Sequence, residues 1–172
     1  MTVVAVTARL TLRTYHPGDE HRLDFYTDPE VCRYLMHEPW TPEDARGAVQ
    51  RRCERTSLDQ GALNALVELD GRVIGIVSAW FVADDTVELG WTFARDVSGQ
   101  GYATEAVQAV LDTVIALDRV RRVTAEMDAR NSASARLAAR VGLREDTLRL
   151  QDCWCKGEWT DTLVYSFTRP SR

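Results

Sequence analysis

A change of hydrophobic period between residues 86 and 117 constrains the fold of this chain more than any other feature. From Thr86 to Phe93 the residues alternate between two faces, which is typical of a half-buried strand. After Gly99-Gln100-Gly101 the apolar residues recur at helical spacing, from Ala103 to Leu117. The sequence therefore predicts a strand, a glycine-rich turn and an amphipathic helix in direct succession.

Two short turns place this strand at the end of an antiparallel run. Asp70-Gly71 is a strong hairpin signal between strands expected at 63–69 and 72–81. Asp84-Asp85 marks a second turn, directly before the strand at 86–93. By the same patterns we expect further strands at 9–15, 123–127, 143–150 and 159–167.

Three helices complete the expected order of elements. Asp28-Pro29-Glu30 and Thr41-Pro42-Glu43-Asp44 are helix starts, and the second helix should run to about Leu58. A third helix is expected from Ser132 to Val141, ended by Gly142. The order predicts an α/β (α+β) fold with a mixed, mostly antiparallel sheet of about six to seven strands flanked by helices. At 172 residues we expect one domain over residues 1–172.

Composition excludes several classes of protein. The net charge is −5 and no basic stripe stands out, so nucleic acid is not the expected partner. No stretch approaches the length of a membrane span and no cleavage signature is visible, so we expect no membrane partner and a cytoplasmic location. The four cysteines form no C-x-x-C pair, which favours reduced thiols and no bound metal.

The glycine-rich turn is suited to a pyrophosphate. A helix start leaves about four backbone N–H groups without partners and carries a partial positive charge. Gly99 and Gly101 would let the backbone approach an anion closely. The Walker pattern is absent, and Thr104 stands where a dinucleotide fingerprint needs its third glycine. A turn without a ligand remains open on this segment alone.

The residues around this turn resemble a known family. Val87-Glu88-Leu89-Gly90-Trp91 and the run from Gly99 to Ala106 are similar to the central strand and acetyl-CoA loop of GNAT acetyltransferases. Asn131-Ser132-Ala133-Ser134, the run from Ala139 to Leu143, and the opening run from Arg9 to Arg13 resemble the branch that acetylates ribosomal-protein N-termini. The resemblance covers nearly the whole chain in the right order.

The resemblance implies a fold, a co-substrate and a set of contacts. It implies acetyl-CoA (coenzyme A) as co-substrate, with no metal. The chain departs from the pattern at Ser98, where an arginine or glutamine is usual, at Ala138 instead of tyrosine, and at Leu143 instead of phenylalanine. The residues that would contact the cofactor are Thr92, Phe93, Ala94, Ser98, Gly99, Gln100, Gly101, Tyr102, Ala103, Thr104 and Asn131.

The resemblance also implies direct acetyl transfer to a bound amine. Deprotonating a lysine-like amine at pH 7 costs roughly 4–5 kcal/mol, whereas an α-amine costs only about 1 kcal/mol. Glu88 is the candidate general base, acting through a water, and Ser134 is the candidate proton donor to the leaving sulfur. The Phe93 N–H would polarise the thioester carbonyl. The alternatives are that Glu88 is a solvated strand residue and that Asn131 and Ser134 only cap a helix.

The acceptor stays open between a protein N-terminus and a small-molecule amine. An antibiotic- or polyamine-modifying acetyltransferase, a non-catalytic acyl-CoA-binding protein, and an enzyme with a longer acyl donor are the rival interpretations. Relatives implied by the resemblance are often dimers, so a homodimer is also open. Aromatic residues in the acceptor regions would line a pocket, form a dimer surface or pack in the core; they are Tyr26, Tyr34, Trp40, Trp80, Trp154 and Trp159.

Overall fold

The antiparallel run expected from the two turns forms the centre of the sheet. The computed structural model describes residues 2–170. In it β4 (Ala62–Leu69), β5 (Arg72–Ala83) and β6 (Thr86–Phe93) pair antiparallel in chain order. Asp70 and Gly71 both have positive φ, 49° and 81°, as a type I′ hairpin turn requires. The Asp-Gly signal therefore fixed this hairpin correctly.

The second half of the sheet joins through one parallel pairing. β7 (Arg122–Asp128) lies parallel to β6, and β9 (Glu158–Thr168) pairs antiparallel with both β7 and β8 (Arg144–Cys155). Strand β8 runs five residues beyond the expected end at Leu150, with a register shift between Arg149 and Cys153. The expected mixed, mostly antiparallel sheet is confirmed, in the order β1-β2-β4-β5-β6-β7-β9-β8.

The sheet has nine strands, so the expectation of about six to seven was too low. The additions are β1 (Val3–Val6), which pairs with β2 (Thr11–Thr14), and β3 (Thr56–Ser57), which pairs with β4. The sequence of β1 is Val-Val-Ala-Val, which has no alternation and therefore no period-two signal. Strand β3 has two residues, too few to show any period.

The helix after Thr41 starts as expected but ends early. Thr41 and Asp44 form a reciprocal capping box at the start of α2 (Pro42–Cys53). The helix ends at Cys53 and not near Leu58, because Thr56 and Ser57 pair with β4. The 3-10 turn η3 (Leu58–Gln60) and Gly61, with φ of 93°, then reverse the chain into β4.

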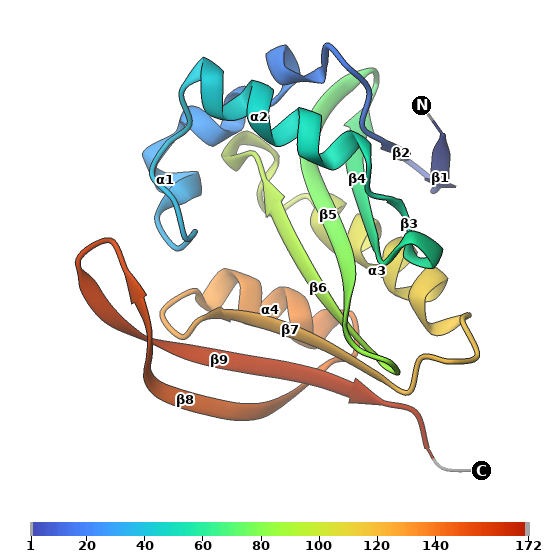
Figure 1. Cartoon of the computed structure of the whole chain (residues 1–172), viewed down its shortest axis with the longest axis vertical. Helices are drawn as coiled ribbons and strands as arrows, with labels where there is room; N and C mark the ends of the chain where they lie inside the picture. Colours follow the sequence, from blue (N-terminus) through green and yellow to red (C-terminus); the bar gives the residue numbers. More distant parts are fainter. Residues whose placement is uncertain (1, 171–172) are drawn as a thin grey trace.

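Helices cover both faces of the sheet (Figure 1). On one side of β4–β6 lie η1 (Asp19–Arg22), η2 (Asp24–Thr27), α1 (Pro29–Cys32) and α2. On the other side α3 (Tyr102–Ile115) packs against β5 and β6 through buried valines 107, 110 and 114. Helix α4 (Ser132–Arg140) packs against β7, β8 and β9. The core therefore holds β6 rigidly, with Val87 and Leu89 buried on the α3 face.

Candidate active site

Strand β6 pairs with β7 over only the first half of its length, although its pairing with β5 continues to its end. It pairs with β7 from Thr86 to Leu89 only, yet continues to Phe93. Figure 1 shows the two strands close together at one end and diverging toward the other. The Ala94 N–H donates to the Ile74 carbonyl of β5 at 2.9 Å. Because N–H groups alternate between the two edges of a strand, the Phe93 N–H faces the unpaired edge.

The ring of Phe93 sits where only a glycine allows it. A Cβ placed on Gly75 of β5 would lie 2.3 Å from the Phe93 ring. Gly75 is the direct partner of Phe93 in the β5–β6 ladder. Gly75 therefore fixes how the end of β6 lies, and with it the direction of the free Phe93 amide.

The glycine-rich turn has the conformation that an anion-binding loop requires. Gly99 and Gly101 have φ of +77° and +82°, a region that favours glycine. Gly101 is the N-cap of α3, and no side chain caps that end. The first-turn N–H groups, beginning at Tyr102 and Ala103, are thus available to an external anion. The Ser98 N–H differs, because it donates to the Arg95 carbonyl at 3.0 Å.

Arg9 braces this loop from the other end of the chain. Its guanidinium donates to the Gln100 carbonyl at 3.0 Å and to the Glu105 carboxylate at 2.7 Å, and it lies 4.4 Å from the Tyr102 ring centre. The Thr7 hydroxyl donates to the other Glu105 oxygen at 2.6 Å. The β1–β2 connection therefore holds both the loop and the first turn of α3.

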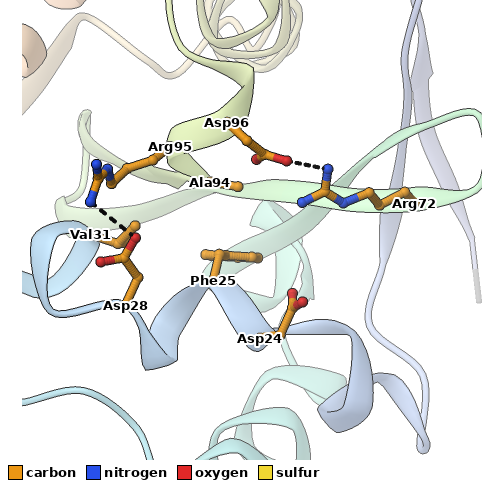
Figure 2. A pocket seen from close by; sticks show the side chains of 8 residues that line it. All are labelled: Asp24, Phe25, Asp28, Val31, Arg72, Ala94, Arg95 and Asp96. Atoms are coloured by element: carbon orange, nitrogen blue, oxygen red, sulfur yellow. Dashed lines mark hydrogen bonds and ion pairs between the residues drawn. The ribbon is translucent and has the colours of Figure 1, made fainter.

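A shallow hollow of about 510 Å³ flanks the segment that leads into the loop (Figure 2). Phe25 and Ala94 form its apolar part, between η2 and the end of β6. Two ion pairs cross it: Arg95 with Asp28 at 3.5 Å, and Arg72 with Asp96 at 2.5 Å. Both pairs are largely exposed, so they position η4 (Arg95–Val97) more than they stabilise the fold.

Ser134 faces β6 across the divergence. The Trp91 indole N–H donates to the Ser134 hydroxyl at 3.3 Å. The Asn131 side-chain oxygen accepts from the Ser134 N–H at 3.1 Å, so Asn131 is the N-cap of α4. The capping role expected as an alternative is therefore present. A role for Asn131 toward the cofactor remains a prediction, and Ser134 keeps a hydroxyl proton directed by its contact with Trp91.

On the opposite face of β6 lies a cleft of about 650 Å³. The residues expected on one face, Glu88, Gly90 and Thr92, all line it. Its other walls come from Ser78 and Trp80 of β5, from the segment between residues 26 and 37, and from β7, β8 and β9. A Cβ on Gly90 would meet the Trp80 ring at 3.2 Å, so Gly90 allows the Trp80 ring to pack closely against β6.

Burial raises the pKa of Glu88 to about 7. This pKa of about 7 includes a smaller increase from the neighbouring Glu126 carboxylate and a decrease from the Arg149 guanidinium. Arg149 is divided between other acids: it pairs with Glu126 and, at 2.9 Å, with Asp152. Within residues 2–170 Glu88 itself forms no ion pair, so it carries the electrostatic properties of a general base that titrates near neutral pH.

The candidate aromatics divide into two groups. Tyr26, Tyr34 and Trp80 line the cleft, and buried Tyr26 stacks on Trp40 at 3.9 Å. Trp154 and Trp159 lie outside the cleft lining, on the β8–β9 hairpin, where they contact each other at 5.4 Å and are more than half exposed.

Two further features, a metal-binding group of side chains and a helix that could span a membrane, are absent from the described residues. No group of three or more His, Cys, Asp and Glu side chains among residues 2–170 is placed to hold a metal ion. No helix in the same part of the chain is long and apolar enough to cross a membrane.

Known proteins share both the sequence pattern and the fold. Residues 9–144 match the family model described as Acetyltransferase (GNAT) domain. The chain belongs to the GNAT acetyltransferase family. It is 28% identical over 163 residues to YnaD of Bacillus subtilis (strain 168), named an uncharacterized N-acetyltransferase, with 93% of this chain and 94% of YnaD covered. The homologues' names and the GNAT domain identify an acyltransferase.

Solved structures share the fold at lower identity. A GNAT-family acetyltransferase from Bacillus anthracis superposes with a TM-score of 0.86 and 24% identity, over 98% of both chains. RimL, a ribosomal L7/L12 α-N-protein acetyltransferase in complex with coenzyme A, superposes with a TM-score of 0.84 and 19% identity, over 97% of this chain and 98% of RimL. The expected GNAT fold is thereby confirmed.

Several residues at the site had no assigned role in the sequence analysis. Arg9 and Trp91 appeared there only in the runs that carry the resemblance. Glu126 and Arg149 lie on strands β7 and β8, and nothing in their local sequence links them to Glu88. The opening run from Arg9 to Arg13 indicated that Arg9 could matter. In contrast, the positions of Glu126 and Arg149 near Glu88 follow only from the strand register.

Proposed function

We propose that this GNAT enzyme uses acetyl-CoA and transfers the acetyl group directly to a primary amine held in the cleft beside Glu88. The observation that carries the proposal is the divergence of β6 from β7 directly before the uncapped start of α3. A pyrophosphate at the Gly99–Thr104 turn would direct a pantetheine arm along the unpaired edge of β6. The reactive thioester would then reach the Phe93 amide.

The side chains at this edge would supply the remaining chemistry. The amine nitrogen attacks the thioester carbon while the Phe93 N–H stabilises the oxyanion. The C–S bond then breaks, the ammonium proton passes through water to Glu88, and the sulfur takes a proton from the Ser134 hydroxyl. Water returns the proton held by Glu88 to the Ser134 oxygen, so both side chains regain their starting state and the products are the amide and the CoA thiol. With a pKa of about 7, Glu88 is ionised in a useful fraction of molecules at neutral pH.

In our proposal the cofactor contacts come mainly from backbone groups. The N–H groups of Gly101, Tyr102, Ala103 and Thr104 would hold the pyrophosphate, and Asn131 would border the pantetheine arm. Ser98 and Ala94 cannot contact the cofactor through their N–H groups, because both groups already donate to carbonyls of the chain. The Thr92 carbonyl also faces β5, since Thr92 is the direct partner of Ile76, so the backbone contacts proposed at the end of β6 are those of Phe93. The side chains of Thr92, Ser98 and Gln100 are the remaining contacts proposed for those residues.

A protein N-terminus or a small-molecule amine remains the acceptor class in this proposal, and the reaction is placed in the cytoplasm. RimL is named for acetylating a ribosomal protein and MccE for self-immunity to Microcin C7, and both share this fold. These two proteins are named for different biological roles, so the fold alone does not select the acceptor, and the cleft side chains must decide which class applies to this chain.

Thermal unfolding with and without acetyl-CoA tests the donor first. A ligand at 100 times its dissociation constant adds about 2.7 kcal/mol to the folded state, which should raise the midpoint by several degrees. Release of free thiol with a panel of amines then tests transfer. Mass spectrometry of the enzyme after acetyl-CoA alone should show no acetyl group on Cys153 or Cys155, which lie in the cleft. No thermal shift at millimolar acetyl-CoA, or a competent acetyl-enzyme, would contradict the proposal.

A further inference from the structure

Arg52 is a cation in the cleft whose charge is balanced by no acid among residues 2–170. It lies on α2 and lines the cleft together with Glu88 and Thr92. Its guanidinium donates to the Tyr15 hydroxyl at 3.1 Å and lies between 5.3 and 5.8 Å from the ring centres of Tyr15, Tyr26 and Trp40. Among residues 2–170 it forms no ion pair with a carboxylate.

The other cations of the cleft are already engaged. Arg149 pairs with Glu126 and Asp152, and Arg130 pairs with Asp128 and Glu158. The remaining two also have partners: Arg33 pairs with Glu30 at 3.7 Å, and the Lys156 ammonium donates to the Cys32 carbonyl at 2.6 Å. Among the cleft arginines within residues 2–170, Arg52 is thus the one that has neutral partners alone; Lys156 shares this property but its ammonium donates to a carbonyl.

Aromatic rings and the phenols of Tyr15 and Tyr26 leave several of the five guanidinium N–H donors without a partner in the described part of the chain. Cation–π contacts offset part of the cost of withdrawing the charge from water, but they accept no N–H bond in the guanidinium plane. A carboxylate or phosphate offers two oxygens that match the planar fork of an arginine. The surroundings of Arg52 are therefore complementary to a compact anion.

In addition to the Arg52 cation, the cleft holds a carboxylate, Glu88, that has no ion-pair partner among residues 2–170. Glu88 lies at one end of the β6 face, and Thr92, at the other end, is a neighbour of the Tyr26 phenol beside Arg52. From Glu88 to Thr92 the strand advances about 13 Å, at about 3.3 Å per residue. Because the thioester is proposed to lie at the Phe93 amide, the attacking amine would lie at the Thr92 end, near Arg52, and would reach Glu88 through water. An acceptor that fits this arrangement carries a negative charge beside its amine.

We propose that the acceptor of this enzyme carries a carboxylate or phosphate, which Arg52 binds while the amine is presented to the thioester. The proposal rests on the amine transfer proposed above and names the class of acceptor. It excludes polyamines, which have no anion for Arg52. A free α-amino acid or short peptide with its C-terminal carboxylate, and an amine with a phosphate group, are the two sources of such an anion.

Matched acceptor pairs test the inference. Alanine, dialanine and trialanine are each compared with their C-terminal amides, and 2-aminoethyl phosphate is compared with ethanolamine, by kcat/KM for thiol release from acetyl-CoA. We expect the anionic member of at least one pair to be preferred by tenfold or more. The peptide and phosphate arms distinguish the two sources, and chain length reports the distance between amine and anion.

Variants of Arg52 separate recognition from folding. Arg52→Gln should bring the anionic acceptor down to the kcat/KM of its neutral partner and leave that partner unchanged. Arg52→Lys should restore part of the preference. Arg51→Gln, an exposed position on the same helix, is the matched control and should keep the full preference. Equal losses on both members of a pair, or no preference in the unaltered enzyme, would overturn the inference.

A binding readout keeps this test independent of catalysis. The shift of the unfolding midpoint by trialanine, by trialanine amide and by 2-aminoethyl phosphate is measured in the unaltered chain and in Arg52→Gln. A shift by an anionic compound that Arg52→Gln abolishes supports the inference even where no amine is acetylated, an outcome that would contradict only the proposed transfer. Transfer to the neutral and anionic acceptors alike would contradict only the inference.

Discussion

The two sides of β6 are proposed to bind different molecules through different groups: backbone groups on one side and side chains on the other. On the side of the unpaired edge, the proposed cofactor contacts are backbone N–H groups, fixed by Gly75, Gly99 and Gly101. On the cleft side the contacts are charged side chains, and they come from β6, β7, β8 and α2. The first side depends on the local path of the chain, and the second depends on which distant segments the sheet brings together.

This difference decides how each side responds to substitution. A backbone site tolerates most side-chain changes and fails when a substitution alters φ or fills the space of the anion. A side-chain site fails residue by residue, with effects confined to the acceptor. The two sides should therefore give separable phenotypes: loss of acetyl-CoA binding from one and loss of turnover with retained acetyl-CoA binding from the other.

The largest effect is expected at Gly101. Gly101→Asp places a side chain at φ of +82° and adds a negative charge where the pyrophosphate is proposed to bind. We expect the acetyl-CoA-induced thermal shift to disappear and turnover to be lost. The measurement is unfolding with and without millimolar acetyl-CoA.

Gly61→Asp is the control for this substitution. Gly61 has φ of +93° and open space around its Cα, and it lies at the end of η3, away from the loop. Both variants carry about 1–2 kcal/mol of backbone strain, so both should melt a few degrees lower. A normal acetyl-CoA shift in Gly101→Asp would remove the loop from the cofactor site.

Glu88→Gln should separate turnover from cofactor binding. A general base contributes roughly 10²- to 10⁴-fold, so kcat should fall within that range while the acetyl-CoA shift is unchanged. In the unaltered enzyme the pH profile of kcat/KM should show an inflection near pH 7, where Glu88 loses its proton, since its pKa is about 7. Above this pH a further rise follows as the acceptor amine loses its own proton. The variant should lack the inflection of Glu88. Glu145→Gln, an exposed acid on β8, should behave as the unaltered chain.

Glu88→Gln, which should lower kcat, should raise the stability of the folded chain at high pH. Folding raises the pKa of Glu88 from 4.5 to about 7, so the folded chain holds this proton to a higher pH than the unfolded chain does. Ionising Glu88 therefore costs folding free energy as the pH rises through this range. Glu88→Gln should melt higher than the unaltered chain at pH 8 and match it near pH 4. A lower midpoint at pH 8 would contradict the assigned cause of the pKa shift.

The backbone side of the molecule was the part that the sequence predicted well. The Asp70-Gly71 turn, the alternation from Thr86 to Phe93 and the glycines before α3 are local signals, and the structure places each as expected. The early end of α2 was missed because the pairing of Thr56 and Ser57 with β4 is a tertiary contact that overrides the helical pattern.

The cleft side could be predicted only in part. The face shared by Glu88, Gly90 and Thr92 follows from strand alternation. The neighbours Glu126 and Arg149 follow from the register of β7 with β6 and of β8 with β9, and a single residue of slip would turn either side chain to the other face. Arg52 has no local signal, since its distinction is the absence of an acidic partner in three dimensions.

The smallest effect is expected at Arg9, a side chain that helps to hold the loop and the first turn of α3. Arg9→Gln removes the guanidinium contacts to Gln100, Glu105 and the Tyr102 ring. The Arg9 side chain is 44% exposed, so the ion pair contributes about 0.2–1 kcal/mol. That free energy corresponds to at most about a fivefold loss of acetyl-CoA affinity.

For Arg9→Gln the two constants to compare are the dissociation constant for acetyl-CoA and the KM for the acceptor. If Arg9 acts only by positioning the loop, the dissociation constant for acetyl-CoA rises while the KM for the acceptor stays constant. A cycle with Glu105→Gln should be non-additive, because the two side chains form one contact. Arg46→Gln, at an exposed position on α2, should change neither constant. A rise in the acceptor KM alone would place Arg9 on the other side of the comparison, and the separation between a backbone-built and a side-chain-built half of the site would then be wrong.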